Sequence, residues 1–485
     1  MAEAEPHLET EPLGNQRAGN ANDAPPPSNG ISRGRMALLF TVMLVTAAGN
    51  TAMQSVMPSI GTALGVEDVW ISLAYTWSAL LWVICAPIWA RRSDQRGRKA
   101  MMALGLTGFI VSMGLCGLFL WFGLVGILSA FWTLLLFAMA RSLFGGFGSA
   151  APPAVQAYVA SRTARSERTQ ALSLIASSFG VGTVIGPALA PLMVFPFWGI
   201  GLTGPFICFT LIAVVALAVI KLRLPNDEPQ FAARGRAYDA SYSSGSSGAP
   251  DDRNYDDEDE DDTLDSSAGG DALPGSAPPK LRWLDPRIRP WVIAGLGSGH
   301  AQAMVLGISG FLVLDRLGLR DSPAEGAGPV GIVLMSGALA TLLAQWGLIP
   351  RFNMGPRAST LSGVAVAVIG VLVLGTAQQL HTIALGYSIA SLGFGLSRPG
   401  TTAGTSLAVS RAEQGQASGI VASVAGASFV FAPALGVWLY NVHQEFAFTL
   451  IVAICVAVLG MGWRSLQADS LLTRNKSQSK SSTKS

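Results

Sequence analysis

The sequence is poor in charge, and its longest stretches contain none. Only 13% of the 485 residues are charged and 50% are hydrophobic, whereas an ordinary soluble domain has roughly one quarter charged residues. This composition argues against a water-soluble fold. Five uncharged runs are each long enough for one or two helices of about 20 residues, the length that crosses a bilayer. They cover residues 100–140, 171–220, 290–314, 326–350 and 358–397.

Motifs of several other function classes are also missing. No Gly-x-x-x-x-Gly-Lys-Ser/Thr phosphate loop occurs, which disfavours an ATP-driven pump. No His-Glu-x-x-His pair or cluster of metal ligands supports a membrane-embedded enzyme or a metal site. A net charge of +2 gives little support for nucleic-acid binding. The four cysteines lack metal-ligand spacing and are expected to be small packing residues: Cys85, Cys116, Cys208 and Cys455.

The uncharged runs are expected to be helical. Lipid offers no partner to an unpaired backbone group, and the runs are too long and uninterrupted for the alternating strands of a barrel. The sequence therefore predicts an all-α polytopic membrane protein with twelve transmembrane helices in two pseudo-symmetric six-helix bundles. The predicted spans are 36–58, 70–90, 101–122, 131–158, 170–194, 200–222, 288–314, 328–350, 358–377, 382–405, 415–440 and 445–464.

Polar segments divide the chain, and the basic ones predict its orientation. Arg and Lys gather in the loops after the second and fourth spans and are missing from those after the first, third and fifth. This bias predicts that both termini lie in the cytoplasm. The Ala- and Gly-rich composition suggests a bacterial protein, for which the cytoplasmic (inner) membrane is the expected location. The predicted parts are a disordered tail (1–35), the first bundle (36–222), an acidic disordered linker (223–287), the second bundle (288–464) and a basic tail (465–485).

An internal repeat relates the two bundles. A shift of 246 residues aligns 167–190 with 413–436 without gaps and gives ten identities in 24 positions. Apolar bias does not explain shared Glu, Gln and Pro, so the fifth and eleventh spans are interpreted as counterparts. A weaker match at a shift of 257 pairs Arg141 with Arg398. Parallel halves of this kind are typical of transporters that bind a small-molecule substrate between them. The shared residues include Glu167/Glu413, Gln170/Gln416, Gly180/Gly426 and Pro187/Pro433.

The loop between the second and third spans resembles a known motif. It reads Ala90-Arg91-Arg92-Ser93-Asp94-Gln95-Arg96-Gly97-Arg98-Lys99, and Asp94, Gly97, Arg98 and Lys99 match the loop motif of the major facilitator superfamily. Ala90, Arg92 and Gln95 depart from it. The resemblance implies that Asp94 pairs with helix ends and basic groups and latches one conformation on the cytoplasmic side. The alternative is that these charges only fix the topology.

Two further segments are similar to motifs of the same superfamily. Arg141 precedes glycines in the fourth span, and a charge inside a span is costly unless it faces a cavity or a partner. Arg141 is therefore a functional candidate, with snorkelling to the interface as the alternative. In the fifth span, a glycine-and-proline pattern looks like the helix-bend motif of the twelve-helix drug:proton antiporter branch, although a structural kink is the alternative. Its residues are Gly180, Gly182, Gly186 and Pro187, and Pro433 repeats the proline.

Carboxylates are missing from the middle of every predicted span. Of 30 acidic residues, 14 lie between 226 and 278, five lie in the N-terminal tail, and the other eleven fall in loops or at span ends. We therefore expect a neutral or anionic solute in preference to a cation. The candidates for lining the cavity, or for coupling transport to a proton gradient, are Arg141, Arg398, His300, Asn50, Gln54, Gln302 and Gln345; helix-helix hydrogen bonding is the alternative for the amides.

These observations favour a secondary active exporter, without a bound cofactor, that a proton gradient drives. An importer of a nutrient or metabolite is the alternative on the same fold. A receptor that signals through the acidic linker is a third interpretation, and deletion of residues 226–278 would separate it from a transporter. The helices are expected to be surrounded by the lipid bilayer. The sequence gives no oligomeric state, and a monomer is assumed.

Overall fold

The computed structural model describes residues 31–163, 165–195, 200–226, 281–409 and 413–469. In this part of the chain nearly all residues are helical, and one isolated bridge, between Phe195 and Gly201, is the only β-type pairing. Twelve helical segments are long and apolar enough to cross a membrane. The predicted all-α architecture with twelve spans is therefore confirmed.

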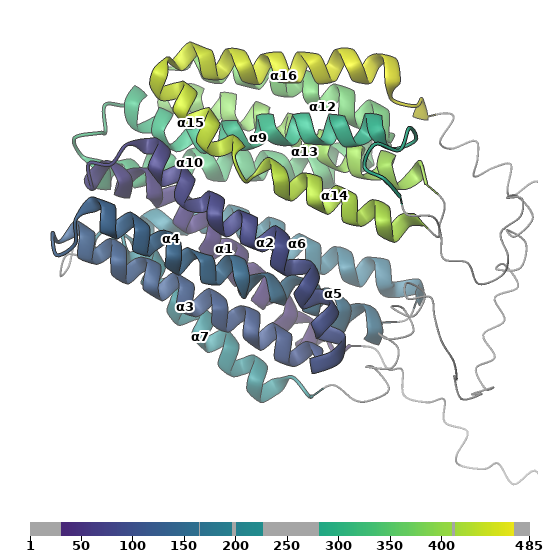
Figure 1. Cartoon of the computed structure of the whole chain (residues 1–485), viewed down its shortest axis with the longest axis horizontal. Helices are drawn as coiled ribbons and strands as arrows, with labels where there is room; N and C mark the ends of the chain where they lie inside the picture. The colour runs from purple at the N-terminus through teal and green to yellow at the C-terminus, as the bar shows by residue number, and fades with distance from the viewer. Residues whose placement is uncertain (1–30, 164, 196–199, 227–280, 410–412, 470–485) are drawn as a thin grey trace, which may run out of the picture.

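The spans form two groups of six, one from each half of the chain (Figure 1). In the N-terminal half they are α1 (Arg33–Ala63), α2 (Asp68–Arg96), α3 (Arg98–Leu124), α4 (Ala130–Gly146) with η1 (Gly148–Ala150) and α5 (Ala151–Arg162), α6 (Arg165–Leu189) with η2 (Ala190–Met193), and α7 (Gly204–Arg223). In the C-terminal half they are α9 (Arg289–Arg316), α10 (Pro323–Leu342) with η3 (Leu343–Leu348) and α11 (Ile349–Arg351), α12 (Pro356–Thr376), α13 (Leu380–Leu407), α14 (Gln414–Ser428) with α15 (Ala432–Val442), and α16 (Gln444–Ser465).

The spans run up and down, so α1 begins and α16 ends at the same end of the bundle. We call this the terminal end, and the opposite end, where α1 turns into α2 and α9 into α10, the far end. Three spans, the fourth, eighth and eleventh, are interrupted where glycine or proline weakens the helix. The η3 turn is a π-helix just before Pro350, which has no N–H to donate, and span eleven breaks between Ser428 and Ala432, just before Pro433.

Two polar segments at the terminal end are packed, one within the predicted linker and one within the predicted C-terminal tail. The backbone N–H of Leu281 donates to Gln416 Oε1 at 2.7 Å, and Leu281 is buried. The Asp469 carboxylate accepts hydrogen bonds from Arg357 N and Ala358 N at 2.8 and 3.0 Å. A carboxylate there satisfies unpaired donors in the first turn of α12. The rest of the predicted tails and linker, including the acidic cluster, lies outside the described residues.

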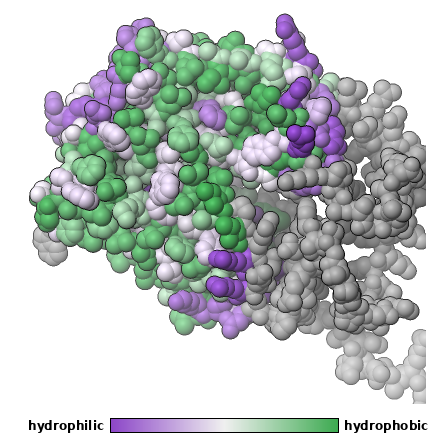
Figure 2. All heavy atoms as spheres, in the orientation of Figure 1, coloured by the Kyte–Doolittle hydropathy of each residue, from purple (hydrophilic) through white to green (hydrophobic). Residues whose placement is uncertain are grey.

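Large apolar side chains cover the outer surface of the helices. Four of them are each more than two thirds exposed: Leu222, Leu192, Trp463 and Phe131. Such exposure of large apolar side chains is unfavourable in water but not in lipid. Figure 2 shows a broad apolar band on this face, with hydrophilic residues gathered toward the two ends of the helices. The chain is therefore an integral membrane protein.

The two halves meet along pairs of helices that the internal repeat relates. The fifth span (α6) packs on the eighth (α10), and the second span (α2) packs on the eleventh (α14 and α15). Exchanging the halves turns one pair into the other, because the fifth span corresponds to the eleventh and the second to the eighth. This agrees with parallel halves related by an axis along the membrane normal.

Close packing of α6 on α1 depends on glycines in the predicted helix-bend motif. A Cβ on Gly186 would overlap the Ala48 carbonyl oxygen and the Thr51 hydroxyl, and Thr51 Oγ1 donates to Gly182 O at 3.3 Å. Pro187 lies near the end of α6, which passes into the 3₁₀ turn η2 at Ala190. The motif therefore brings α1 and α6 close together and ends the helix, and the proline does not kink its middle.

Replacing Gly186 by alanine is expected to destabilise the protein by about 1–3 kcal/mol, because the added methyl group forces α1 and α6 apart. The matched control is Gly146→Ala, since nothing lies within 4 Å of a Cβ built on Gly146. Thermal unfolding in detergent measures both. Equal melting temperatures for the two variants would contradict the proposed close contact.

Candidate functional site

A cavity of about 370 Å³ lies between the two halves. Its walls come from α1, α2, α4, α5 and α6 on one side and from α9, α10, α14 and α15 on the other. Most of the lining is apolar or aromatic, including Trp82 and Phe179. None of the described residues that line it is acidic. Such a pocket suits an organic solute that is held by a few polar groups.

Arg141 is the charged residue that faces this cavity. It lies on α4, and its side chain is buried. Arg141 Nη2 donates a hydrogen bond to Asn50 Oδ1 of α1, and the guanidinium carbon lies 4.4 Å from the ring centre of Phe144 and 5.8 Å from that of Tyr75. Since these contacts hold it inside the bundle, Arg141 does not snorkel to the interface.

Two donors in this cavity have no partner in the described part of the chain. Arg141 Nε and the Tyr75 hydroxyl are buried without a hydrogen bond to any described residue. Asn50 and Gln54, which share one face of α1, both line the cavity. Buried polar groups are normally paired, so unpaired donors in a cavity indicate where a ligand binds. Tyr75 is a candidate that the sequence analysis missed, because no motif or charge marks it.

An ion-pair network joins the two halves at the far end. Arg320, in the turn after α9, donates to both Asp68 carboxylate oxygens at 2.8 and 2.7 Å and to Thr62 Oγ1 at 3.2 Å. It also contacts Asp315 at 2.7 Å, and Asp315 accepts a hydrogen bond from the Tyr440 hydroxyl at 2.8 Å. The hydrogen bonds that Arg320 donates to Asp68, opposed by partial burial, raise the pKa of Arg320 above its usual value. The Asp68–Arg320 pair is therefore a candidate far-end gate.

The remaining candidates lie elsewhere. Arg398 and Gln302 line a second cavity, between α9, α13 and α14. His300 and Gln345 line neither cavity. His300 shares a face of α9 with the exposed Ile293 and Leu296, and its Nδ1 lies 2.7 Å from Leu296 O. The described residues contain no cluster of three potential metal ligands.

The weaker repeat does not place its two arginines at equal depth. Arg141 lies 11 residues after the far-end start of α4 at Ala130, whereas Arg398 lies 18 residues after the far-end start of α13 at Leu380. At about 1.5 Å per residue, this separates their depths by about 10 Å. The predicted pairing of these residues is therefore wrong in register, although each arginine faces a cavity.

A comparison with models of protein families identifies the family to which this chain belongs. The model described as Major Facilitator Superfamily matches residues 39–404, more than half of the chain. The chain belongs to the major facilitator superfamily. Its members are transporters, so a membrane transporter and not an enzyme is the conclusion at this level.

Solved structures of superfamily proteins share the fold. The xylose transporter XylE from E. coli, in an inward open conformation, is 12% identical with a TM-score of 0.60 and covers 90% of this chain and 96% of that one. The human organic anion transporter MFSD10 is 17% identical with a TM-score of 0.56, and the match covers 90% of this chain and 100% of that one. At these identities the likeness shows the fold alone.

Curated relatives match over shorter regions. The multidrug resistance protein MdtG of Proteus mirabilis is 24% identical over 172 residues, 34% of this chain and 40% of that protein. A homologue of the multidrug efflux pump PmrA from Lactococcus lactis is 30% identical over 173 residues, which are 35% of this chain and 38% of that protein. The chain thus aligns with about two fifths of the length of these relatives.

The superfamily loop motif can be followed in part. Gly97 has a φ of 91°, which favours glycine, and separates α2 from α3. Arg98 is buried, and Lys99 Nζ donates to Lys221 O of α7 at 3.1 Å. The Asp94 side chain lies outside the described residues, so the latch stays a prediction.

A second charged cluster at the terminal end anchors the start of α14. Arg287 donates to both carboxylate oxygens of Glu413 at 3.0 and 2.8 Å and to Asp285 at 3.0 Å. Hydrogen bonds from Arg287 hold the pKa of Asp285 below its ordinary value, and the bonds to Glu413 and then Asp285 raise that of Arg287. Glu413 and Gln416, the repeated residues, thus hold the segment that enters α9.

This cluster is expected to make stability depend on acid pH. A depressed pKa means that Asp285 stabilises the fold above its unfolded pKa of about 3.9, and that the contribution is lost as pH falls through the lower folded value. Because Arg287 is 46% exposed, the loss is expected to be about 1 kcal/mol or less. The range from pH 5 to pH 3 covers about two units around that pKa. Over this range, the melting temperature of the wild type should fall more than that of Arg287→Ala. Parallel pH profiles would contradict this assignment.

Proposed function

We propose that this chain is a secondary active exporter that moves a small organic solute, neutral or anionic, by alternating access. The observation that carries the proposal is the cavity between the halves, which has unpaired donors at Arg141 and Tyr75 and an ion pair at its far end. Rocking of the halves around a site near the middle of the membrane is the mechanism that such a duplicated fold favours.

The cavity chemistry supports the proposed substrate class. Arg141 supplies a fixed positive charge, while none of the described lining residues is acidic. An organic cation would find no countercharge there and would meet repulsion from the guanidinium. A carboxylate or sulfonate could accept two parallel hydrogen bonds from the arginine. The apolar remainder would hold an aromatic or aliphatic body.

Export driven by a proton gradient is the proposed direction and energy source. The relatives that are named as multidrug resistance and efflux proteins support export, and so does the glycine-and-proline pattern of α6. Import is the second candidate, because a D-xylose–proton symporter shares the fold with a TM-score of 0.63 at 14% identity. Asp68 and Asp315 belong to the ion-pair network at the far end, whereas His300 lines neither cavity.

The proposed location is the cytoplasmic (inner) membrane, with the terminal end in the cytoplasm, and the working unit is a monomer surrounded by lipid. Under this proposal the cavity faces inward, in keeping with the ion pair that joins the two halves at the far end. The basic loop residues Arg96, Arg98 and Lys99 support this orientation.

The test is flux in proteoliposomes of known orientation with an imposed pH gradient. Radiolabelled 4-aminobenzoate is the anionic probe, 4-aminobenzamide the neutral one, and 4-aminobenzyltrimethylammonium the permanent cation. The expected result is saturable flux of the anion from the terminal side to the far side, while protons move down their gradient in the opposite direction. Net movement toward the terminal side would establish import, and robust transport of the cation would overturn the proposed substrate class.

A further inference from the structure

The C-terminal half contains a cavity of its own, of about 320 Å³. It lies between α9, α13 and α14, and Arg398 is the charged residue that lines it. None of the described lining residues is acidic. Arg398 lines this space, and its guanidinium has no ion-pair or hydrogen-bond partner among the described residues. A cation inside a span without a countercharge is costly, so a function is the default expectation.

Other donors meet Arg398 in the same cavity. The Gln302 amide makes no hydrogen bond to a described residue, and the buried indole Nε1 of Trp291 is also unpaired. Ser298 and Thr401, in contrast, donate to backbone carbonyls of their own helices at 2.8 and 3.0 Å. Arginine has five N–H donors and no acceptor. The cavity therefore combines positive charge with unused donors and suits the oxygens of an anion.

Position along the helix sets this cavity apart from the one at Arg141. Arg398 lies nine residues before the terminal-end limit of α13 at Leu407, about 14 Å along the axis. Arg141 lies deeper, 11 residues from the far-end start of α4, about 17 Å from the far end. The two cations are therefore staggered between the terminal end and the far end.

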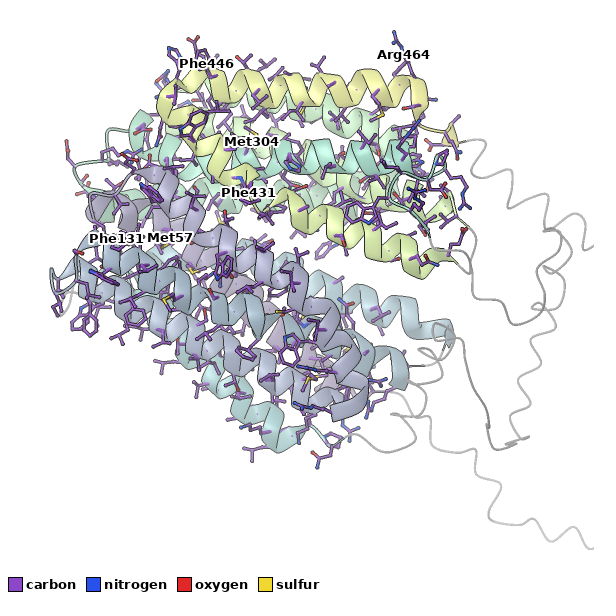
Figure 3. All side chains as sticks on the ribbon, viewed as in Figure 1. Met57, Phe131, Met304, Phe431, Phe446 and Arg464 are labelled. Carbon is purple, nitrogen blue, oxygen red and sulfur yellow. The ribbon has the colours of Figure 1, made fainter. Side chains whose placement is uncertain are left out.

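One aromatic side chain borders both cavities. Phe429 lines the central cavity and also the second one. It lies at the break in span eleven, after α14 ends at Ser428 and before α15 begins at Ala432. Figure 3 labels the neighbouring Phe431 at this break, about midway along the bundle. Because the backbone there makes no continuous helix, Phe429 can change position more easily than a residue within a helix.

We infer that the Arg398 cavity is an entry subsite for the anionic group of the transported solute, and that Phe429 separates it from the deeper site at Arg141. A carboxylate or sulfonate binds first between Arg398 and Gln302, nearer the terminal end. It then passes Phe429 and exchanges this arginine for Arg141. The inference rests on the proposed transport of an anion, and it adds a second binding position that the central cavity does not require.

The test is the number of 4-aminobenzoate molecules bound per chain, measured by equilibrium dialysis of the full-length protein in nanodiscs of neutral phosphatidylcholine. Two are expected for the wild type and one each for Arg398→Gln and Arg141→Gln. The affinity lost at the altered site is about 10- to 100-fold, the change expected when hydrogen bonds to a charged group are removed. Arg398→Lys, which keeps the charge, should retain the second molecule with weaker affinity, and the melting temperatures show whether each variant is folded.

Different outcomes separate the inference from the proposed function. If Arg398→Gln still binds two molecules, or the wild type binds one or none, the subsite is overturned, whatever the flux. If Arg398→Gln loses one molecule but the wild type shows no flux, the subsite stands and transport fails. Loss of the second molecule when phosphatidylglycerol replaces part of the lipid would identify a lipid headgroup as the occupant and overturn a solute subsite.

Phe429 gives an independent measurement. Phe429→Ala should leave two binding sites. It should speed the exchange of bound 4-aminobenzoate between the Arg398 site and the deeper Arg141 site by about tenfold, equivalent to lowering the barrier by about 1.4 kcal/mol. Phe429→Leu, which keeps a large apolar side chain, is the matched control. Unchanged exchange in the alanine variant would overturn the role of Phe429 as the separating group.

Discussion

Replacing Arg141 by glutamine is expected to reduce flux of an organic anion by about 10- to 100-fold at subsaturating concentration, the equivalent of removing charged hydrogen bonds worth about 1.5–3 kcal/mol. Glutamine can still pair with Asn50 across α1 and α4, but it offers no positive charge to the solute. Because a buried charge is itself costly, the variant should remain folded and can melt at the same or a higher temperature. Flux in proteoliposomes and thermal unfolding in detergent measure the two effects separately.

Arg141→Lys is the matched variant for charge. It keeps the cation but loses the planar fork and the contacts with the rings of Phe144 and Tyr75. An intermediate flux is therefore expected. If glutamine lowers flux only in proportion to the amount of folded protein, Arg141 is a structural residue, and the proposed recognition of an anion is wrong.

Replacing Asp68 by asparagine is expected to open the far end of the cavity. The pair with Arg320 is bidentate, joins the two halves and includes a buried carboxylate. Its loss should shift the equilibrium by about 1–3 kcal/mol toward a state that is open at the far end. In a chain whose four cysteines are replaced, Gln54→Cys reports the change. A membrane-impermeant thiol reagent on the far side should label it about 5- to 150-fold faster at equilibrium exchange.

Asp315→Asn is the matched control. Asp315 also contacts Arg320, at 2.7 Å, but both residues belong to the C-terminal half. Removing that carboxylate weakens the local network and leaves the contact with Asp68 in place. Labelling of position 54 from the far side should therefore stay near the wild-type rate. Equal acceleration by both substitutions would show that the network only supports its own half.

The architecture could be predicted from the sequence because each span carries its own signal. The absence of charge over some 20 residues predicts a crossing helix without knowledge of its neighbours. The repeated Glu, Gln and Pro of spans five and eleven predict two related halves, which the packing of α6 on α10 and α2 on α15 bears out. The limits of the linker were predicted less well, because Leu281 is held by a contact with a residue over a hundred positions away.

The site could be predicted only where a residue is unusual in its surroundings. Arg141 stands out as a charge in an apolar run, whereas Tyr75 and Phe429 resemble other aromatic residues of the spans. The Asp68–Arg320 pair joins residues 252 positions apart and becomes visible only when the halves are packed together. His300 and Gln345 were predicted to face the cavity, but the side that each helix presents depends on its neighbours. For Gln345, the π-helical turn η3 also changes the helical phase.

Pairs of spin labels would test most directly whether the two halves rock around an enclosed site. With the native cysteines replaced, one pair at the exposed positions Ile127 and Asp321 reports the far end, and another at Arg96 and Arg351 reports the terminal end. On adding 4-aminobenzoate and acidifying the far side, the first distance should lengthen while the second shortens. Distances that both stay fixed, or that both grow together, would contradict alternating access by this chain.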